Sequence, residues 1–190
     1  MGNKKTIEKL VFIALLVGLS VVLGIIDNFL SAFSSTQGVR LGIANVVILT
    51  GIYYLSFRDA LLLVILKSLL TGLILGNPMT FTIGFSGTLL SFFIMYILIH
   101  LGKNEVSLIG ISVTGGISHN IGQIFALTFY HGMVVIFNLI WLIPIGIGTG
   151  VFVGYLVTII KRYLDKGQVF KTITNKDNKQ IDLEKLINED

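Results

Sequence analysis

The sequence predicts an all-α integral membrane protein, a bundle of six transmembrane helices. Of its 190 residues, 54% are hydrophobic and only 13% are charged. The mean hydropathy is +0.89. The apolar residues gather in six segments joined by short connections, and each segment is long enough, or nearly so, for the roughly 20 helical residues that cross a bilayer core. These features together indicate a membrane protein.

The six segments lie at about residues 7–26, 39–56, 59–76, 80–100, 107–131 and 134–160. We expect residues 1–163 to form one membrane domain. Residues 164–190 contain five lysines and six acids, so we expect a polar cytoplasmic tail whose composition favours disorder. The lysines before the first segment are also compatible with a signal peptide. The apolar run is long and lacks a small-residue cleavage site, which favours a retained helix.

The positive charges predict an orientation, because short cytoplasmic connections are rich in Lys and Arg. With six crossings, the side opposite the termini holds Arg40 alone, whereas the other side holds Lys4, Lys5, Lys9, Arg58, Lys103, Lys161 and Arg162. Both termini are therefore expected in the cytoplasm. We interpret the net charge of +4 as this orientation signal, so no nucleic acid partner is predicted, and membrane lipid is the expected surroundings.

The first two segments carry two features of interest. Ala14 and Gly18 form a small-xxx-small pair, which predicts close contact with a partner helix or with another helix of the same bundle. Residues 27–38 form the longest outside connection and are placed to cover a site. The second segment opens with Arg40 and carries Asn45. Arg40 either extends to outer headgroups or reaches an anionic ligand group.

Lys67 lies near the middle of the third segment. We find no Asp or Glu inside any apolar segment, so no acid is expected to pair with this ammonium group. An unpaired charge at that depth costs a few kcal/mol or more. Neutralisation, water, polar groups or an anionic ligand would relieve the cost. A lysine that extends to the membrane surface is the alternative, and the central position argues against it.

The fifth segment carries a dense polar cluster. On a helix of 100° per residue, Tyr130 and a group of neighbouring residues share one face, whereas the isoleucines lie opposite. The polar face comprises Ser112, Gly116, His119, Asn120 and Gln123, and the apolar face Ile117, Ile121 and Ile124. The flanking sequence is too hydrophobic for water, so the polar face should point inward. Two roles stay open, a ligand or partner site and contacts between helices.

The sixth segment has Asn138 and Trp141 near its outer end, where Trp either anchors the helix at the interface or lines a pocket mouth. Further along, Gly146, Gly150 and Gly154 form a GxxxGxxxG face, which predicts that another helix crosses closely here. We take these glycines as candidates for docking. Pro144 is expected to bend the helix.

Several chemistries lack their motifs. The sequence has no G-x-x-x-x-G-K-[ST] phosphate loop, no HExxH and no aspartate-rich diphosphate motif. Cysteine is absent, and a lone His119 with amides is a poor metal site. We therefore predict no metal, no cofactor and no catalysis by this chain alone.

Three stretches carry a resemblance to a known family: RLGIAN at residues 40–45, Lys67, and GGISHNIGQ at residues 115–123. They resemble the heptaprenyl diphosphate synthase component I family, also called the Gx transporter family, over about residues 7–163. That family is similar to the substrate-binding S components of energy-coupling-factor transporters. Those are six-helix proteins that capture scarce nutrients and work with an energy-coupling transmembrane subunit and two ATPases. The resemblance implies a prokaryotic plasma membrane protein.

In S components the docking face on the first helix uses an Ala-xxx-Ala pattern, to which Ala14-xxx-Gly18 is similar. The resemblance thus favours an S-component-like subunit that binds a small, anionic substrate for uptake. The alternative is an accessory subunit, component I, of a heptaprenyl diphosphate synthase, and a bundle without a ligand is a third possibility. The expected substrate contacts are Arg40, Asn45, Lys67, His119, Asn120, Gln123, Tyr130 and Asn138, and the expected docking residues are Ala14, Gly18, Gly146, Gly150 and Gly154.

Overall fold

The computed structural model describes residues 2–31, 40–102 and 106–166. These residues form six α-helices and one 3₁₀ helix, with no strand among them, so the all-helical class is confirmed. The elements are α1 (Gly2–Ser31), α2 (Asn45–Tyr54), α3 (Phe57–Leu75), α4 (Pro78–Leu101), α5 (Leu108–His131), η1 (Met133–Asn138) and α6 (Leu139–Lys166). Most of the predicted tail and of the predicted connection at 27–38 lies outside the described residues.

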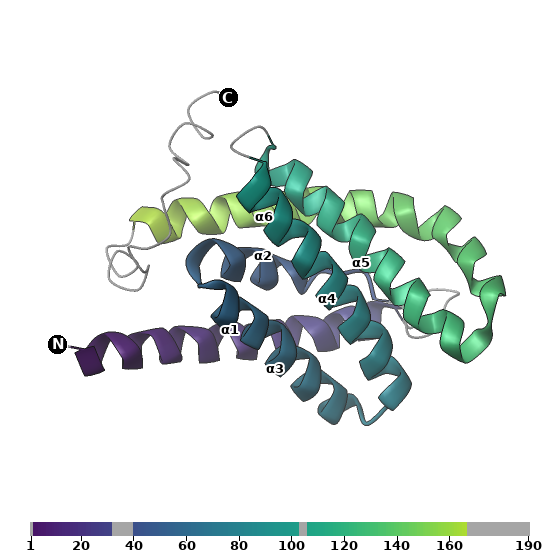
Figure 1. The fold of residues 1–190 in the computed structure, drawn as a ribbon, viewed down its shortest axis with the longest axis horizontal. Coiled ribbons are helices and arrows are strands. Elements are labelled where there is room, and N and C mark those ends of the chain that lie inside the picture. Colours follow the sequence, from purple (N-terminus) through teal and green to yellow (C-terminus); the bar gives the residue numbers. More distant parts are fainter. Residues whose placement is uncertain (1, 32–39, 103–105, 167–190) are drawn as a thin grey trace.

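The long helices run back and forth between two ends of the molecule. In Figure 1, α1 and α6 run roughly horizontally, one below the other, and α3, α4 and α5 run obliquely to them. The start of α1, the α2–α3 connection and the end of α6 lie toward one end, whereas the turns after α3 and α5 lie toward the other. Gly76 and Gly132 end α3 and α5 with φ of 61° and 75°, a conformation that glycine adopts without strain.

The short helix α2 differs from the prediction. It has ten residues, about 15 Å of helix, and is too short to cross a bilayer core of about 30 Å. The predicted segment 39–56 is wrong in its first part, because residues 40–44 are not helical. Nine of the ten residues of α2 are buried, and α2 contacts every other α-helix. The bundle is therefore built around it.

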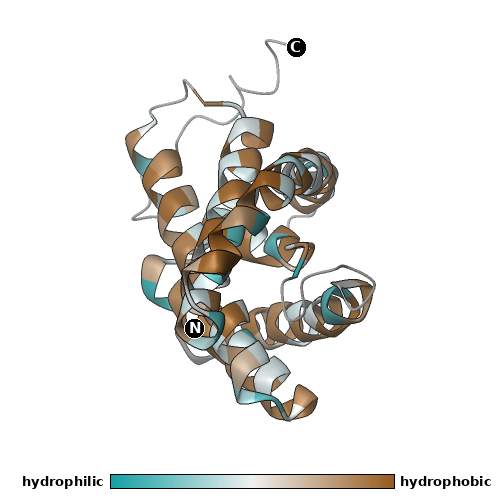
Figure 2. Cartoon of the chain, turned by 90° about the vertical axis from the view of Figure 1, so that its right-hand side faces the viewer, coloured by the Kyte–Doolittle hydropathy of each residue, from teal (hydrophilic) through white to brown (hydrophobic). Residues whose placement is uncertain are grey.

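Three helical stretches among the described residues are long and apolar enough to cross a membrane: Lys9–Leu30, Pro78–Leu101 and Met133–Asp165. Large hydrophobic side chains are exposed on their outer surfaces and on α3 and α5, for example Leu15, Leu73 and Phe129. Figure 2 shows hydrophobic residues along most of the helices. Surfaces of this kind are compatible with a lipid environment. Six crossings stay a prediction.

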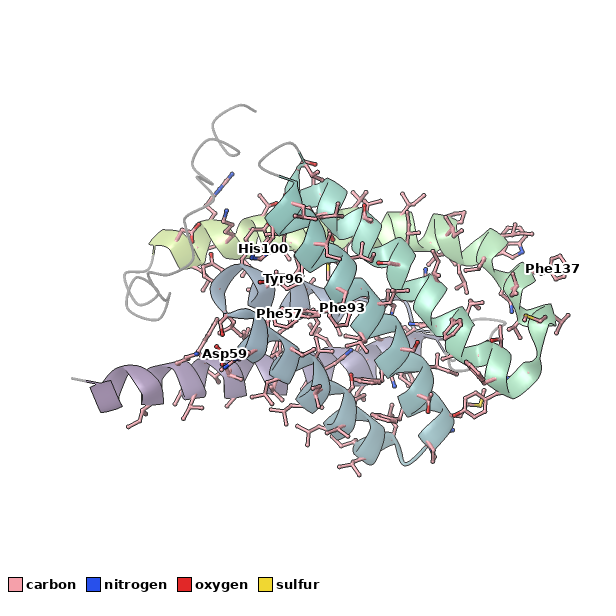
Figure 3. All side chains as sticks on the ribbon, viewed as in Figure 1. Phe57, Asp59, Phe93, Tyr96, His100 and Phe137 are labelled. Carbon is pink, nitrogen blue, oxygen red and sulfur yellow. The ribbon has the colours of Figure 1, made fainter. Side chains whose placement is uncertain are left out.

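Aromatic rings and one ion pair hold the helices together at one end. The ring of Phe57, at the start of α3, lies 4.9 Å from that of Tyr96 and 6.4 Å from that of Phe93 on α4, between ring centres. Lys9 pairs with Asp59 between α1 and α3. Figure 3 shows these rings where α3 meets α4, with Phe137 far away at the opposite end.

The glycine face of α6 packs on α5. A Cβ added at Gly150 would lie 2.5 Å from the Cα of Val113, and one at Gly154 would lie 2.9 Å from the Cα of Ile109. Likewise, a Cβ at Gly116 would lie 2.4 Å from the carbonyl oxygen of Gly146. The predicted close crossing is confirmed, but α5 of the same chain supplies the second helix. Gly146, Gly150 and Gly154 are thus covered within the chain rather than open to another subunit.

The buried interior contains two apolar clusters with polar residues between them. On α4, Ile83 belongs to one cluster and Phe92 to the other. On α5, Ile111 belongs to the cluster of Phe92, and Ile124 to that of Ile83. The buried residues between these positions are all small or polar on both helices. This order places a polar layer across the middle of the bundle.

Candidate functional site

The polar layer contains seven large polar or charged side chains, each at most 3% exposed. We call them the polar centre: Asp27, Arg40, Asn45, Lys67, His119, Asn120 and Gln123. Six of the seven were predicted as substrate contacts from the sequence, and the structure brings them into one buried region. Asp27 was not predicted.

Asp27 lies inside α1, not in an outside connection. Its carboxylate accepts hydrogen bonds from the backbone N–H groups of Leu41 (2.8 Å), Gly42 (2.8 Å) and Ile43 (3.1 Å). Gly42 has a φ of 90°, and this turn lets three successive N–H groups face one carboxylate. Asp27 therefore satisfies the N–H groups of the non-helical backbone that precedes α2, which would otherwise be unpaired inside the bundle.

Lys67 projects from α3 into the same region. Its ammonium group donates to the Thr88 hydroxyl on α4 at 3.0 Å. In the described chain no acid forms an ion pair with Lys67, but Asp27 interacts electrostatically with both Lys67 and Arg40. If all three groups are ionised, two positive charges and one negative charge leave the centre with a net charge of +1.

Arg40 is held by its backbone and by its side chain. Its N–H donates to Oε1 of Gln123 at 2.8 Å, and its carbonyl accepts from Nε2 of Gln123 at 3.1 Å. The guanidinium donates to the carbonyl of Thr80 at 3.1 Å and packs against Gly84, where a Cβ would lie 2.4 Å from a guanidinium nitrogen. Arg40 is thus turned into the bundle and not toward the headgroups.

The contacts of Gln123 fix the tautomer of His119. Nε2 of Gln123 can only donate, and it contacts Nε2 of His119. The imidazole Nε2 must then accept, so the proton of a neutral His119 is on Nδ1. Gln123 thus connects His119, one helical turn earlier on α5, to the backbone of Arg40.

Asn120 makes a different contact, donating to the carbonyl of Leu142 on α6 at 2.5 Å. The polar face of α5 therefore does join helices, as one of the two predicted roles requires. Ile121 on the opposite face is exposed as expected, whereas Ile124 is buried against α4 and η1 neighbours.

Contacts between the helices leave some buried polar side-chain atoms without a hydrogen bond. Among the described residues, several buried side-chain atoms have no hydrogen-bond partner: Arg40 Nε, Asn45 Oδ1, Ser68 Oγ, Thr71 Oγ1, Ser112 Oγ, His119 Nδ1 and Asn120 Oδ1. Each such group costs about 1–3 kcal/mol if it stays unpaired. Buried polar atoms in native proteins usually bind protein groups or water. These atoms therefore point to water or to ligand groups in the polar centre.

A narrow crevice adjoins this centre. It is lined by Gly42, Asn45, Ser112, Gly116, Thr149, Gly150 and Val153. Ligand pockets usually measure about 300–1,000 Å³, whereas this crevice is too narrow to admit even a water molecule. Binding of a larger molecule requires the helices or the segment before α2 to move.

The remaining predicted residues lie elsewhere. Tyr130 is 47% exposed and donates to the Thr82 hydroxyl, and Asn138 is half-buried in η1. Neither belongs to the polar centre. Ala14 and Gly18 are exposed on α1, and no atom of the described chain lies within 4 Å of a Cβ added at Gly18. Their surface is free for contact with lipid or with a partner.

Comparison with known protein families gave a match that covers most of the chain. The family described as heptaprenyl diphosphate synthase component I matches residues 16–160, which is more than half of the chain and includes the whole polar centre. No curated protein and no solved structure matched. Among the described residues, no group of three or more His, Cys, Asp or Glu side chains is placed to hold a metal ion. From the extent of the match, the chain belongs to the heptaprenyl diphosphate synthase component I family.

Proposed function

We propose that this chain is the membrane-embedded accessory subunit of a heptaprenyl diphosphate synthase, and that its polar centre binds the anionic end of an isoprenoid diphosphate. A separate subunit would carry out the prenyl transfer. The observation that carries the proposal is a buried centre in which Arg40 and Lys67 outnumber the one acid, Asp27. The family match supports the partnership with a synthase.

The chemistry of an isoprenoid diphosphate suits this arrangement. Its hydrocarbon chain is compatible with an apolar bundle in lipid, whereas its head needs cations or N–H donors. Hydrogen bonds to a charged group contribute about 1.5–3 kcal/mol each. Lys67 has three N–H donors and one hydrogen-bond partner in the described chain, so it retains donors for such a group.

The division of labour follows from the sequence. Magnesium ions that hold a diphosphate are usually bound by carboxylates together with the phosphates themselves. This sequence lacks an aspartate-rich motif, so we assign the metal-dependent step to the partner subunit. The membrane subunit would retain the lengthening chain at the bilayer.

Co-expression with a soluble synthase subunit that carries aspartate-rich motifs tests this proposal. The two should co-purify, and vesicles containing both should convert a short allylic diphosphate into longer products faster than the soluble subunit alone. Lys67→Met should reduce the stimulation without abolishing co-purification. A synthase that neither binds this chain nor changes in rate or product length would refute the proposal.

A second candidate is an S-component-like subunit for uptake of a small anionic nutrient. The exposed surface at Ala14 and Gly18 favours it, because S components dock through a small-residue face of the first helix. Co-purification with an energy-coupling transmembrane subunit and ATPases, and a small anion detected by native mass spectrometry, would favour uptake over isoprenoid synthesis.

The distribution of Lys and Arg predicts six crossings with cytoplasmic termini for either candidate. Reporter fusions after Asn77 and after His131 should then report the outside, and fusions after Lys103 and after Lys166 the inside. The second crossing would combine α2 with the non-helical residues 40–44. An outside C-terminus would contradict the topology.

A further inference from the structure

The backbone before α2 has the form of an anion site that is already filled. We propose that residues 41–43 are an anion-binding nest, that the carboxylate of Asp27 occupies it as an internal ligand, and that a phosphate or diphosphate group takes its place. This inference deepens the proposed function and rests on its anion-binding part. It identifies the backbone contacts of the ligand and the group that must leave for it to bind.

The nest is defined by three donors and one unusual turn. Leu41, Gly42 and Ile43 direct their N–H groups at a single carboxylate over distances of 2.8 to 3.1 Å. Successive N–H groups of this kind form a concave site that binds anions in phosphate-binding loops. The φ of 90° at Gly42 gives the turn, and a Cβ there would also lie 3.3 Å from the His119 ring. The geometry therefore depends on glycine.

The charges around the nest exceed what one carboxylate needs. Arg40 directly precedes the nest and is 3% exposed, with Nε unpartnered. Lys67 is 2% exposed and interacts electrostatically with Asp27. Two cations and three N–H groups thus surround a single negative charge. A phosphate group carries more charge and more acceptor oxygens, so it would make fuller use of these donors.

Asp27 is placed so that it can leave. It lies in the last part of α1, four residues before Ser31, where the helix ends. On the same helix, Gly24 packs closely against Thr71 and Lys67, with a Cβ that would lie 3.3 Å from the Thr71 hydroxyl. A small shift at the end of α1 would separate Asp27 from the nest and open the space beside Lys67.

A purely structural Asp27 predicts the opposite response to mutation. If the carboxylate only caps the backbone before α2, then removing its charge should loosen the nest and weaken anion binding. If it competes with the ligand, the same change should strengthen binding. The two interpretations therefore differ in sign, which one substitution can determine.

The experiment measures binding of inorganic diphosphate to the purified full chain in detergent by calorimetry. Asp27→Asn keeps the size of the side chain and removes its charge, and it should bind diphosphate at least about tenfold more tightly than the wild type, or about 1.4 kcal/mol. Asp59→Asn is the matched control, because it removes an acid at the other end of the bundle, and it should not change the affinity. Adding Lys67→Met to Asp27→Asn should remove the gain.

Equal or weaker binding by a folded Asp27→Asn would overturn the inference, and so would an equal gain in Asp59→Asn. If Asp27→Asn does not fold, amide hydrogen exchange in the wild type decides. Saturating diphosphate should change the exchange of residues 41–43 and leave residues 57–60 unchanged. Unchanged exchange at 41–43 would also overturn the inference. Diphosphate binding as predicted, without any association with a synthase, would retain the nest and refute the synthase proposal alone.

Discussion

Two regions of this bundle are equally buried and have opposite chemistry. In the apolar core, Ile48, Leu63 and Val64 are at most 1% exposed, and the residues of the polar centre are at most 3% exposed. The apolar side chains need only to fill space, because dispersion and solvent exclusion are not directional. The polar centre needs a partner for every donor and acceptor. It is therefore the region where fold and function can be separated by mutation.

The two regions also differ in whether contacts within the chain satisfy all of their buried atoms. The apolar core is a continuous cluster drawn from all six α-helices. The polar centre supports non-helical backbone through Asp27 and Gln123, and it still leaves polar atoms unpaired. Buried charge lowers stability unless it is fully paired, so its presence favours a role that the apolar core does not have.

The largest effect is expected where α5 and α6 approach closest, because both regions depend on this contact. Gly150→Leu would push a side chain into the backbone of α5, which cannot yield as a flexible side chain does. We expect a loss of at least about 3 kcal/mol in the free energy of unfolding. Gly148→Leu is the control on the same helix, since no atom lies within 4 Å of a Cβ there, and its effect should stay within about 0.5 kcal/mol. Thermal unfolding in detergent measures both, and similar losses would contradict the packing described.

A cavity in the apolar core should lower stability and leave binding intact. Leu63→Ala removes a side chain with no exposed surface, and such changes cost about 2–5 kcal/mol. Diphosphate affinity, measured well below the unfolding temperature, should match the wild type. A parallel loss of affinity would show that the two regions are energetically coupled.

Lys67→Met should give the reverse result. The sequence alone predicts at least about tenfold weaker binding of an anionic ligand, roughly 1.4 kcal/mol, with no loss of stability. The structure gives a physical reason why stability should not fall. Without Lys67, the charges of Arg40 and Asp27 cancel, so no net charge remains in the buried centre. Unchanged affinity together with a marked loss of stability would mean that Lys67 is a structural residue.

The sequence was sufficient to predict the helical class, the inward polar face of α5 and the close crossing at Gly150. These features depend on hydropathy and on short-range periodicity, which a single segment displays. The sequence did not reveal that α2 begins only at Asn45, because residues 39–56 are mostly apolar and contain no charged residue except Arg40.

Asp27 was missed for a related reason. A charged residue usually marks the end of a membrane segment, and the connection was predicted to start there. Phe29 and Leu30, which follow Asp27, were the signal that the helix continues to Ser31. Its partners, residues 41–43, lie 14 to 16 positions away along the chain and become neighbours only in the folded bundle.

The smallest effect on stability is expected at Gly18, on the face of α1 that points away from both regions. Gly18→Leu should leave the unfolding temperature and the diphosphate affinity unchanged, because the added side chain meets no atom of the described chain. If Ala14 and Gly18 dock on a partner, the same change should abolish co-purification with that partner. Gly24→Leu is the matched control on the inward face, where a Cβ lies 3.3 Å from the Thr71 hydroxyl, and it should destabilise the bundle itself. If Gly18→Leu still assembles with the partner, this face of α1 contacts lipid and is not a docking surface. The polar centre would then be the only functional region that these substitutions detect.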